Sequence, residues 1–260
     1  MRAVGWVRVV VAAPFGLLFG SFLTVAVYRL PRGESLVAPR SRCPSCGRQL
    51  RAIDNVPLVS WLFLRGRCHF CRARISAIYP LLELASGALF AGVALRLDDP
   101  WVAVLVAPFS ALLVAISVID IRTKKIPNRL VYPALLVSAG FLVVARLAGA
   151  DVDLIRAGVG FLALGGGFLL IALIVPKGMG MGDVKLAALI GLVLGSQGLA
   201  LVGVAAGVGV LLGGVGSIVA LLAGASRKQA IPFGPFLAAG ALVAVFAGSE
   251  IASRYLDLMR

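Results

Sequence analysis

The chain has few charged residues for its length. Only 14% of its 260 residues are Asp, Glu, Lys or Arg, whereas about a quarter of the residues of a soluble domain are charged. At the same time, 60% of the residues are apolar. This composition excludes an ordinary soluble enzyme, a disordered tail and a fibrous repeat. With 31 glycines available for close helix packing, it predicts an all-α protein that crosses a membrane several times.

Acidic residues are scarcer than basic ones. There are 11 Asp and Glu against 25 Lys and Arg, which gives a net charge of +14. In a soluble protein such an excess would suggest nucleic acid, but basic residues also hold the cytoplasmic loops of membrane proteins in place. We therefore expect no nucleic-acid partner, and we expect anionic lipid headgroups to contact the basic segment.

Long apolar runs predict about eight membrane spans, with both termini outside the cell. The expected spans are residues 9–28, 81–97, 101–119, 130–144, 158–175, 186–195, 199–224 and 232–248. The first run could be a signal peptide, but ten arginines and only two acids follow it between residues 29 and 74. That bias predicts a cytoplasmic segment. The run 186–195 is too short to cross a bilayer unless it borrows neighbours or is shielded from lipid by protein.

Pairs of glycines four residues apart recur in the apolar runs. Gly16 with Gly20 and Gly203 with Gly207 are two examples. Because such spacing lets helix backbones approach closely, we expect these glycines to pack against other helices and to have no chemical role.

Cysteine is also rare, and all four cysteines lie in the one sizeable polar segment. They form two Cys-x-x-Cys pairs, Cys43 with Cys46 and Cys68 with Cys71, and 21 residues lie between the pairs. Two such pairs predict a zinc-ribbon-like site in which four thiolates hold one structural ion. The alternative is two disulfides, which a reducing compartment disfavours. The single histidine, His69, is interpreted as a bystander because the four thiolates already fill the site.

Few carboxylates are available for chemistry, and two of them end apolar runs near the expected cytoplasmic face. Asp120 closes a span, and Asp183 follows Gly180 and Gly182, 63 positions later. Each acid has a structural alternative: Asp120 could pair with a nearby basic residue, and Asp183 could cap a helix. Together, two close carboxylates can share one proton, so that one acts as acid while the other activates water. Glycines beside Asp183 would admit an extended peptide.

Several separated motifs resemble the bacterial type IV prepilin leader peptidases. Gly180-Met-Gly-Asp183 resembles the Gly-x-Gly-Asp motif of intramembrane aspartyl proteases, and Asp120 stands seven residues before Pro127, as in that family. Further matching segments are residues 20–25, 28–31, 55–61, 64–68, 79–83 and 231–236. Two positions depart from the pattern: Thr24 and Asn128 stand where many members have Asn and Asp.

The resemblance implies a multi-pass enzyme of the bacterial inner membrane, with its active site and its zinc insertion at the cytoplasmic face. It implies that Asp120 and Asp183 cleave the basic leader from prepilins or pseudopilins. It also implies N-methylation of the new terminus with S-adenosylmethionine, although no dinucleotide-type glycine motif marks a methyl-donor site. We expect Gly180, Gly182 and Glu83 to contact substrate. For Glu83, the alternative is a cap on the second span.

Three segments are expected along the chain: a first helix at residues 1–29, a four-cysteine insertion at 30–80 and a protease core at 81–260. Two rival functions use the same residues. A proton- or cation-coupled transporter would employ the two aspartates as a relay, and a non-enzymatic scaffold would bind a partner through its zinc segment.

Overall fold

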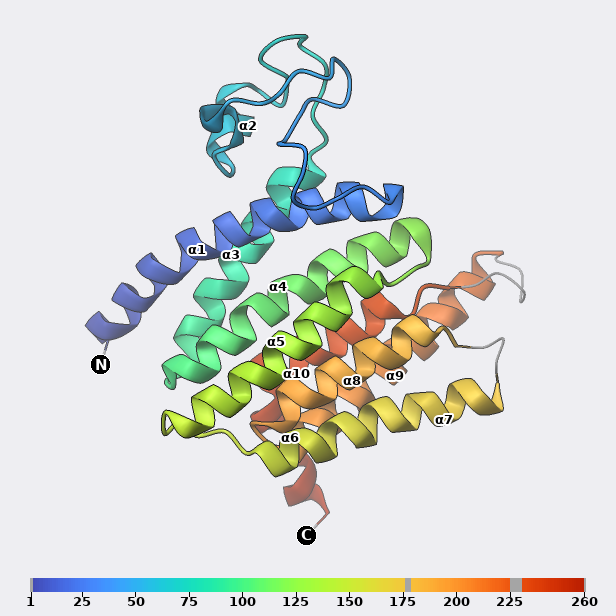
Figure 1. The fold of residues 1–260 in the computed structure, drawn as a ribbon. Coiled ribbons are helices and arrows are strands. Elements are labelled where there is room, and N and C mark those ends of the chain that lie inside the picture. Colours follow the sequence, from blue (N-terminus) through green and yellow to red (C-terminus); the bar gives the residue numbers. More distant parts are fainter. Residues whose placement is uncertain (1, 176–178, 225–230, 260) are drawn as a thin grey trace. The chain divides into compact units, whose positions relative to one another are not determined.

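The computed structural model describes residues 2–175, 179–224 and 231–259, and in these ranges nearly all of the regular secondary structure is helical (Figure 1). The only extended pairings there are two isolated antiparallel bridges, Arg42 with Gln49 and Arg67 with Arg74. Among the described residues, seven helices are long and apolar enough to cross a membrane. The expected class, an all-α polytopic membrane protein, is therefore confirmed.

The chain divides into two compact units. The first consists of Met1–Asp98 and Ala107–Ala115, and the second of Asp99–Val106 and Ile116–Arg260. Helix α4 (Pro100–Thr123) contributes residues to both units. Each unit is described separately below.

In the first unit, α1 (Arg2–Arg29) packs along α3 (Ile78–Arg96) (Figure 1). The contact depends on two glycines of α1. A Cβ at Gly16 would lie 2.7 Å from the Ser86 carbonyl oxygen, and a Cβ at Gly20 would lie 2.8 Å from the Cα of Glu83. Only glycine permits such an approach, so the expected packing role of this pair is confirmed.

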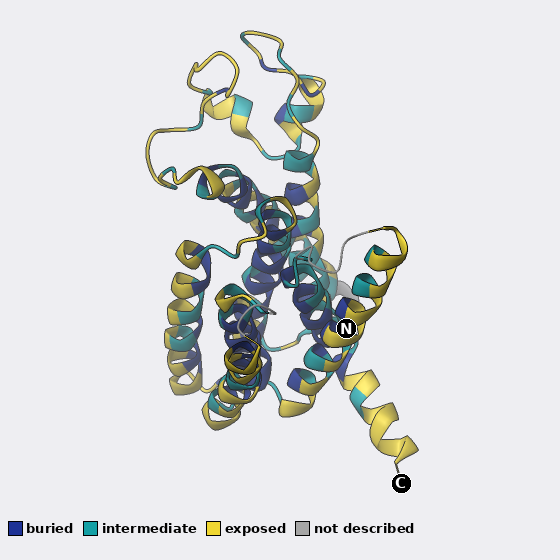
Figure 2. Ribbon diagram, turned by 90° about the vertical axis from the view of Figure 1, so that its right-hand side faces the viewer, coloured by how far each residue is buried: buried dark blue, intermediate teal, exposed yellow. Residues whose placement is uncertain are grey.

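Between α1 and α3 the chain forms a polar insertion with little regular structure. It contains η1 (Leu30–Arg32), η2 (Ala52–Asn55) and the short helix α2 (Val59–Phe63). Most of its residues are exposed (Figure 2). A segment of this size buries too little apolar surface to be stable without further support.

The second unit is built around α8 (Met181–Gly195), which packs against most of the other helical segments of the unit. These neighbours are α5 (Asn128–Leu147), α6 (Leu154–Gly160), η3 (Phe161–Gly165), α7 (Gly166–Ile174), α9 (Leu199–Leu222) and α10 (Gly234–Leu258). A segment of π-helix, η3, joins α6 to α7.

Helix α8 is short but enclosed by protein. Its 15 residues correspond to about 22 Å at 1.5 Å per residue, less than the roughly 30 Å of a bilayer's hydrocarbon core. Every residue from Leu186 to Gly195 is buried. The sequence analysis expects this run either to borrow neighbouring residues or to be shielded by protein. The helix does extend back to Met181 and is buried from Leu186 onward, but α8 is not among the seven candidate spans.

Glycine contacts bring α8 and α6 together at backbone distance. A Cβ at Gly191 would collide with the Gly160 carbonyl, and a Cβ at Gly195 would lie 2.6 Å from the Arg156 carbonyl oxygen. The sequence analysis proposed packing roles for Gly203 and Gly207 instead. That expectation is wrong, because a Cβ at either position would meet no atom within 4 Å among the described residues.

The helix ends of the second unit gather at two opposite ends of α8. At its C-terminal end, Asp153 N donates to the Ser196 carbonyl (3.0 Å), and Asp151 N donates to Oδ2 of Asp99 (3.1 Å). At its N-terminal end lie Asp183, the turn after α4 and the start of α10, which are described next. Acidic side chains therefore collect at one end, and the basic residues that follow Asp120 collect at the other.

Candidate active site and metal centre

Asp120 lies in the last turn of α4 and is buried, with 4% of its surface exposed. Its Oδ2 accepts a hydrogen bond of 3.0 Å from the backbone N–H of Gly234, the first residue of α10. A Cβ at Gly234 would lie 2.7 Å from this oxygen. Glycine is therefore required for the backbone to reach the carboxylate. No Lys or Arg pairs with Asp120 among the described ion pairs.

The helix that carries Asp120 ends immediately after it. Lys124 adopts a left-handed conformation (φ 53°) and donates its N–H to the Asp120 carbonyl at 2.7 Å. The following Ile126-Pro127 segment turns the chain back toward α5. The α4–α5 turn thus leaves Asp120 at the end of the helix.

Asp183 lies in the first turn of α8, where it is half-buried. Its backbone N–H donates to the Gly180 carbonyl (3.0 Å), and a Cβ at Gly180 would lie 3.2 Å from Oδ2 of Asp183. Asp183 therefore lies inside the first turn, and the structural alternative, in which it caps the helix, is wrong. The residue that precedes α8 as its cap is Gly180.

One apolar side chain, Ile126, joins the three segments of the site. A Cβ at Gly182 would lie 2.9 Å from Cβ of Ile126, and a Cβ at Gly234 would lie 3.2 Å from its Cδ1. The carboxylates of Asp120 and Asp183 are also close enough for their charges to act on each other. The two acids, 63 positions apart in sequence, are thus brought to one end of the second unit.

A second polar contact joins α5 to α8 beside this pair. Lys185 Nζ donates to Oδ1 of Asn128 at 3.0 Å and lies 4.9 Å from the centre of the Tyr132 ring. Asn128, one of the positions that depart from the family pattern, therefore contacts a lysine. Because the side chain of Asn128 is a neutral amide, it adds no third carboxylate to the pair Asp120 and Asp183.

The four cysteines of the first unit come together as one cluster. Their sulfur atoms all lie within 4.8 Å of one another, and Sγ of Cys43 is 3.8 Å from Sγ of Cys71. Tetrahedral zinc with Zn–S bonds of about 2.3 Å separates its sulfurs by about 3.8 Å. The donor set therefore fits a closed four-thiolate site, and the cysteines are free of disulfides. His69 packs edge-on against Phe70 and is not part of the cluster.

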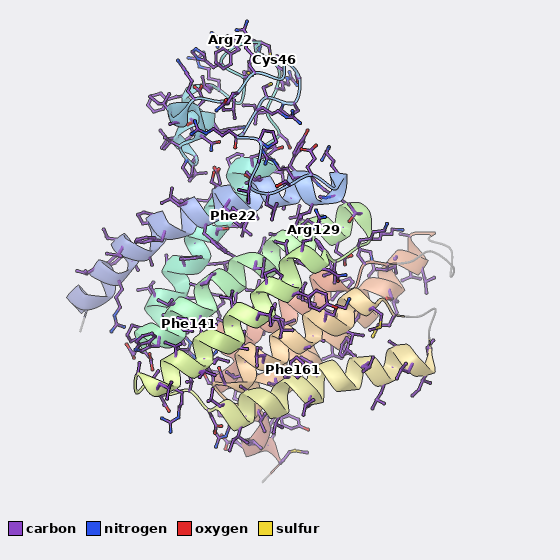
Figure 3. The ribbon with its side chains drawn as sticks, viewed as in Figure 1. Phe22, Cys46, Arg72, Arg129, Phe141 and Phe161 are labelled. Atoms are coloured by element: carbon purple, nitrogen blue, oxygen red, sulfur yellow. The ribbon has the colours of Figure 1, made fainter. Side chains whose placement is uncertain are left out.

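The two cysteine pairs use the same backbone turn. Cys43 N donates to the Arg48 carbonyl (2.9 Å), and Cys68 N donates to the Ala73 carbonyl (2.8 Å). The residue after each pair has a positive φ, 70° at Gly47 and 58° at Arg72. Cys46 and Arg72 lie together in the outer part of the insertion (Figure 3). Two matched turns thus present two thiols each to one point.

Backbone donors prepare one of these thiols for metal binding. Burial acts to raise the pKa of Cys43, but hydrogen bonds from the backbone at Cys46 and Ser45 outweigh it, and the pKa falls to about 7. A thiol with such a pKa is partly thiolate at neutral pH, which is the form that binds a metal.

The remaining predicted contacts lie on the packed faces of α1 and α3. Glu83 is buried, and its Oε2 accepts a hydrogen bond of 2.8 Å from the backbone N–H of Leu58 in the insertion. Thr24 donates to the Ser21 carbonyl at 2.7 Å, which is a contact within its own helix. Glu83 therefore binds the insertion and does not cap α3.

The sequence analysis missed two backbone donors, Gly234 N–H to Asp120 and Leu58 N–H to Glu83. A backbone donor leaves no side-chain signature. The only available signal was that each residue falls in a segment matching the family pattern, 231–236 and 55–61.

Comparisons with known proteins agree with this arrangement. Residues 15–97 match the family model of the bacterial peptidase A24 N-terminal domain, and residues 107–248 match that of the type IV leader peptidase family. Three similar proteins are each named prepilin leader peptidase/N-methyltransferase. That of Bacillus subtilis is 38% identical over 94% of this chain and 96% of its own. That of Stutzerimonas stutzeri is 38% identical over 97% and 95%, and that of Burkholderia pseudomallei is 40% identical over 92% and 85%.

No solved structure matches the chain. Even so, one family model covers more than half of the 260 residues, and the relatives align over nearly the whole length. The chain therefore belongs to the type IV leader peptidase family.

Proposed function

We propose that this chain is a membrane-embedded aspartic endopeptidase that removes the leader of prepilins or pseudopilins and then N-methylates the new terminus. The names of its relatives support both activities. The observation that carries the proteolytic half is the convergence of Asp120 and Asp183 at one end of the second unit. In this proposal residues 30–80 hold the metal and residues 81–260 carry proteolysis.

The geometry suggests how the two acids divide the work. The Gly234 N–H holds one oxygen of Asp120 in place, while Asp183 lies on a glycine-flanked turn. One carboxylate removes a proton from water, which attacks the scissile carbonyl, while the other, protonated, donates its proton to the carbonyl oxygen. The first carboxyl then passes the proton it gained to the leaving amine, and the second recovers its own from the hydroxyl of the tetrahedral intermediate as the C–N bond breaks. Gly180 and Gly182 leave room for the extended substrate backbone.

We also propose that this site faces the cytoplasm of a bacterium, in its inner membrane. Basic residues surround the Asp120 end of the second unit and the cysteine insertion of the first, whereas Asp99, Asp151 and Asp153 mark the opposite end of the second unit. The positive-inside rule assigns basic ends to the cytoplasm. The ion held by Cys43, Cys46, Cys68 and Cys71 is structural zinc, since four thiolates leave no open position.

The test is mass spectrometry of a prepilin incubated with membranes containing the enzyme, with and without S-adenosylmethionine. Asp120→Asn and Asp183→Asn keep the side-chain shape but remove the shared proton, so cleavage should fall by about 10²–10⁴-fold. Asp151→Asn, at the other end of the unit, is the matched control and should cleave normally.

Near-normal cleavage by either active-site variant would reject the assignment. If the wild-type protein carried protons or cations across liposomes and left the prepilin intact, the transporter alternative would replace the proposal.

A further inference from the structure

The first unit contains a cavity that proteolysis does not explain and that extends beyond the metal cluster, although Cys43 and Cys68 are among its lining residues. Its volume is about 340 Å³, and it is bounded by α1, α3 and the insertion. Polar side chains of α1, Ser21 and Thr24, line it together with Tyr79 and Glu83 of α3 and Trp61 of α2. Pockets for small molecules occupy roughly 300–1,000 Å³ and combine apolar walls with a few polar groups. The cavity fits that description.

Glu83 is the distinctive polar group of this cavity. Only 8% of the residue is exposed, and the Leu58 N–H and the Ser21 side chain both hydrogen-bond its carboxylate. Leu58 donates from a backbone with positive φ (59°), a conformation unfavourable for leucine. The insertion therefore adopts a strained turn that orients this carboxylate.

The other two carboxylates that line the cavity have basic partners. Asp54 makes two hydrogen bonds with Arg51, at 2.8 and 2.9 Å, and Glu34 lies 3.9 Å from Arg42. Among the described ion pairs, none involves Glu83. A buried carboxylate without a basic partner is unfavourable unless a cation completes the site or the group takes up a proton.

We infer that the cavity binds S-adenosylmethionine and that the Glu83 carboxylate recognises its positively charged sulfonium group. The inference rests on the methyltransferase half of the proposed function and adds the site that the sequence could not locate. The residues fit the ligand: the buried Glu83 faces the cavity, and Trp61 and Tyr79 supply aromatic surface for a cation and a purine base. The lining also includes Arg29, Arg42 and Arg74, whose positive charge suits the carboxylate of the same ligand. When bound, the ligand supplies the methyl group.

The neutral product, S-adenosylhomocysteine, allows a sharp test because it has the same shape but lacks the sulfonium charge and the methyl group. Dissociation constants for both compounds are measured by calorimetry on the detergent-solubilised full-length protein. Glu83→Gln keeps an oxygen acceptor for the Leu58 N–H and removes the charge. It should weaken S-adenosylmethionine binding at least about tenfold and change S-adenosylhomocysteine binding about twofold or less.

Asp98→Asn is the matched control, because it removes a carboxylate of the same unit that has a basic partner, Arg8, and is not among the residues that line the cavity. It should leave the ratio of the two dissociation constants unchanged. Zinc content and S-adenosylhomocysteine binding report whether each variant is folded.

The outcomes separate the inference from the function on which it rests. If Glu83→Gln weakens both compounds equally, or neither, while the wild-type enzyme binds and methylates, only the assignment of Glu83 is overturned. If the wild-type protein binds neither compound but still removes the leader, the methyl-donor cavity and the methyltransferase proposal both fail, and the peptidase proposal stands.

Discussion

Gly234 has no side chain, yet at the residue scale it determines where Asp120 lies. Its N–H donates to Oδ2 of Asp120, and the space that a Cβ would need is already taken by that oxygen. The Asp120 carboxylate and the start of α10 are therefore held together by a contact that only glycine allows.

We predict that Gly234→Ala lowers kcat/KM for leader cleavage by about 100-fold or more, because displacement of a catalytic group by about 1 Å can have an effect of that size. The measurement is the cleavage rate of a prepilin in detergent. Gly214→Ala is the control, since a Cβ there meets nothing within 4 Å among the described residues. Equal rates for the two variants would show that the Gly234 contact does not position Asp120.

At this scale the sequence predicted the side chains but not their backbone partners. Asp120, Asp183 and the four cysteines could be singled out because so few acids and cysteines occur in an apolar chain. The donors Gly234 and Leu58 act through main-chain N–H groups, which every residue except proline possesses. Their roles depend on distances across the fold.

At the scale of elements, α8 connects most of the second unit. Its glycines Gly191 and Gly195 pack directly against the backbone carbonyl groups of Gly160 and Arg156 in α6. Its N-terminal turn carries Asp183. A change that separates α8 from α6 should therefore disturb the whole unit.

We predict that Gly191→Ala destabilises the protein by about 1–3 kcal/mol, as overpacking of a filled interior usually does. The added methyl group would collide with the Gly160 carbonyl. Gly203→Ala provides the contrast: it meets open space and should stabilise α9 by about 0.5–1 kcal/mol through helix propensity. Thermal unfolding in detergent measures both. A Gly191→Ala protein as stable as wild type would contradict the packing described.

Apolar length was enough to predict the helices and that α8 needs neighbouring residues or shielding, but it did not identify the glycines that pack. The pairs Gly16 with Gly20 and Gly203 with Gly207 have the same spacing, yet only the first is enclosed. A glycine facing lipid and a glycine facing another helix look identical until the neighbouring helix is placed.

At the scale of the whole molecule, we expect the insertion to depend on a metal and the helices to be independent of it. Its described residues are mostly exposed loops held by two cysteine turns. We predict that purified protein contains one zinc ion per chain. Its removal by a chelator, or by Cys43→Ser, should expose residues 30–77 to trypsin while the helices persist. The measurements are metal analysis and mass mapping of the fragments, and equal protection with and without zinc would refute the prediction.

Acid should have the same effect as the chelator. The pKa of Cys43 lies at about 7, and protons compete with the metal for thiolates. The apparent affinity for zinc should therefore decrease as the pH falls below about 7, which competition with a chelator over a pH series would measure. An apparent affinity that is the same at pH 8 and pH 5 would be inconsistent with thiolate ligation.

The shortness of α8 has a consequence for how hydrolysis can occur inside a lipid layer. At about 22 Å it ends roughly 8 Å short of the hydrocarbon thickness, and protein surrounds it on its sides. The missing length must be made up by connecting polypeptide or by solvent, and Asp183 stands at one end of the helix. Where solvent makes up the missing length, water would enter a depression in the membrane surface beside Asp183. It could then reach a peptide bond that lies below the level of the headgroups.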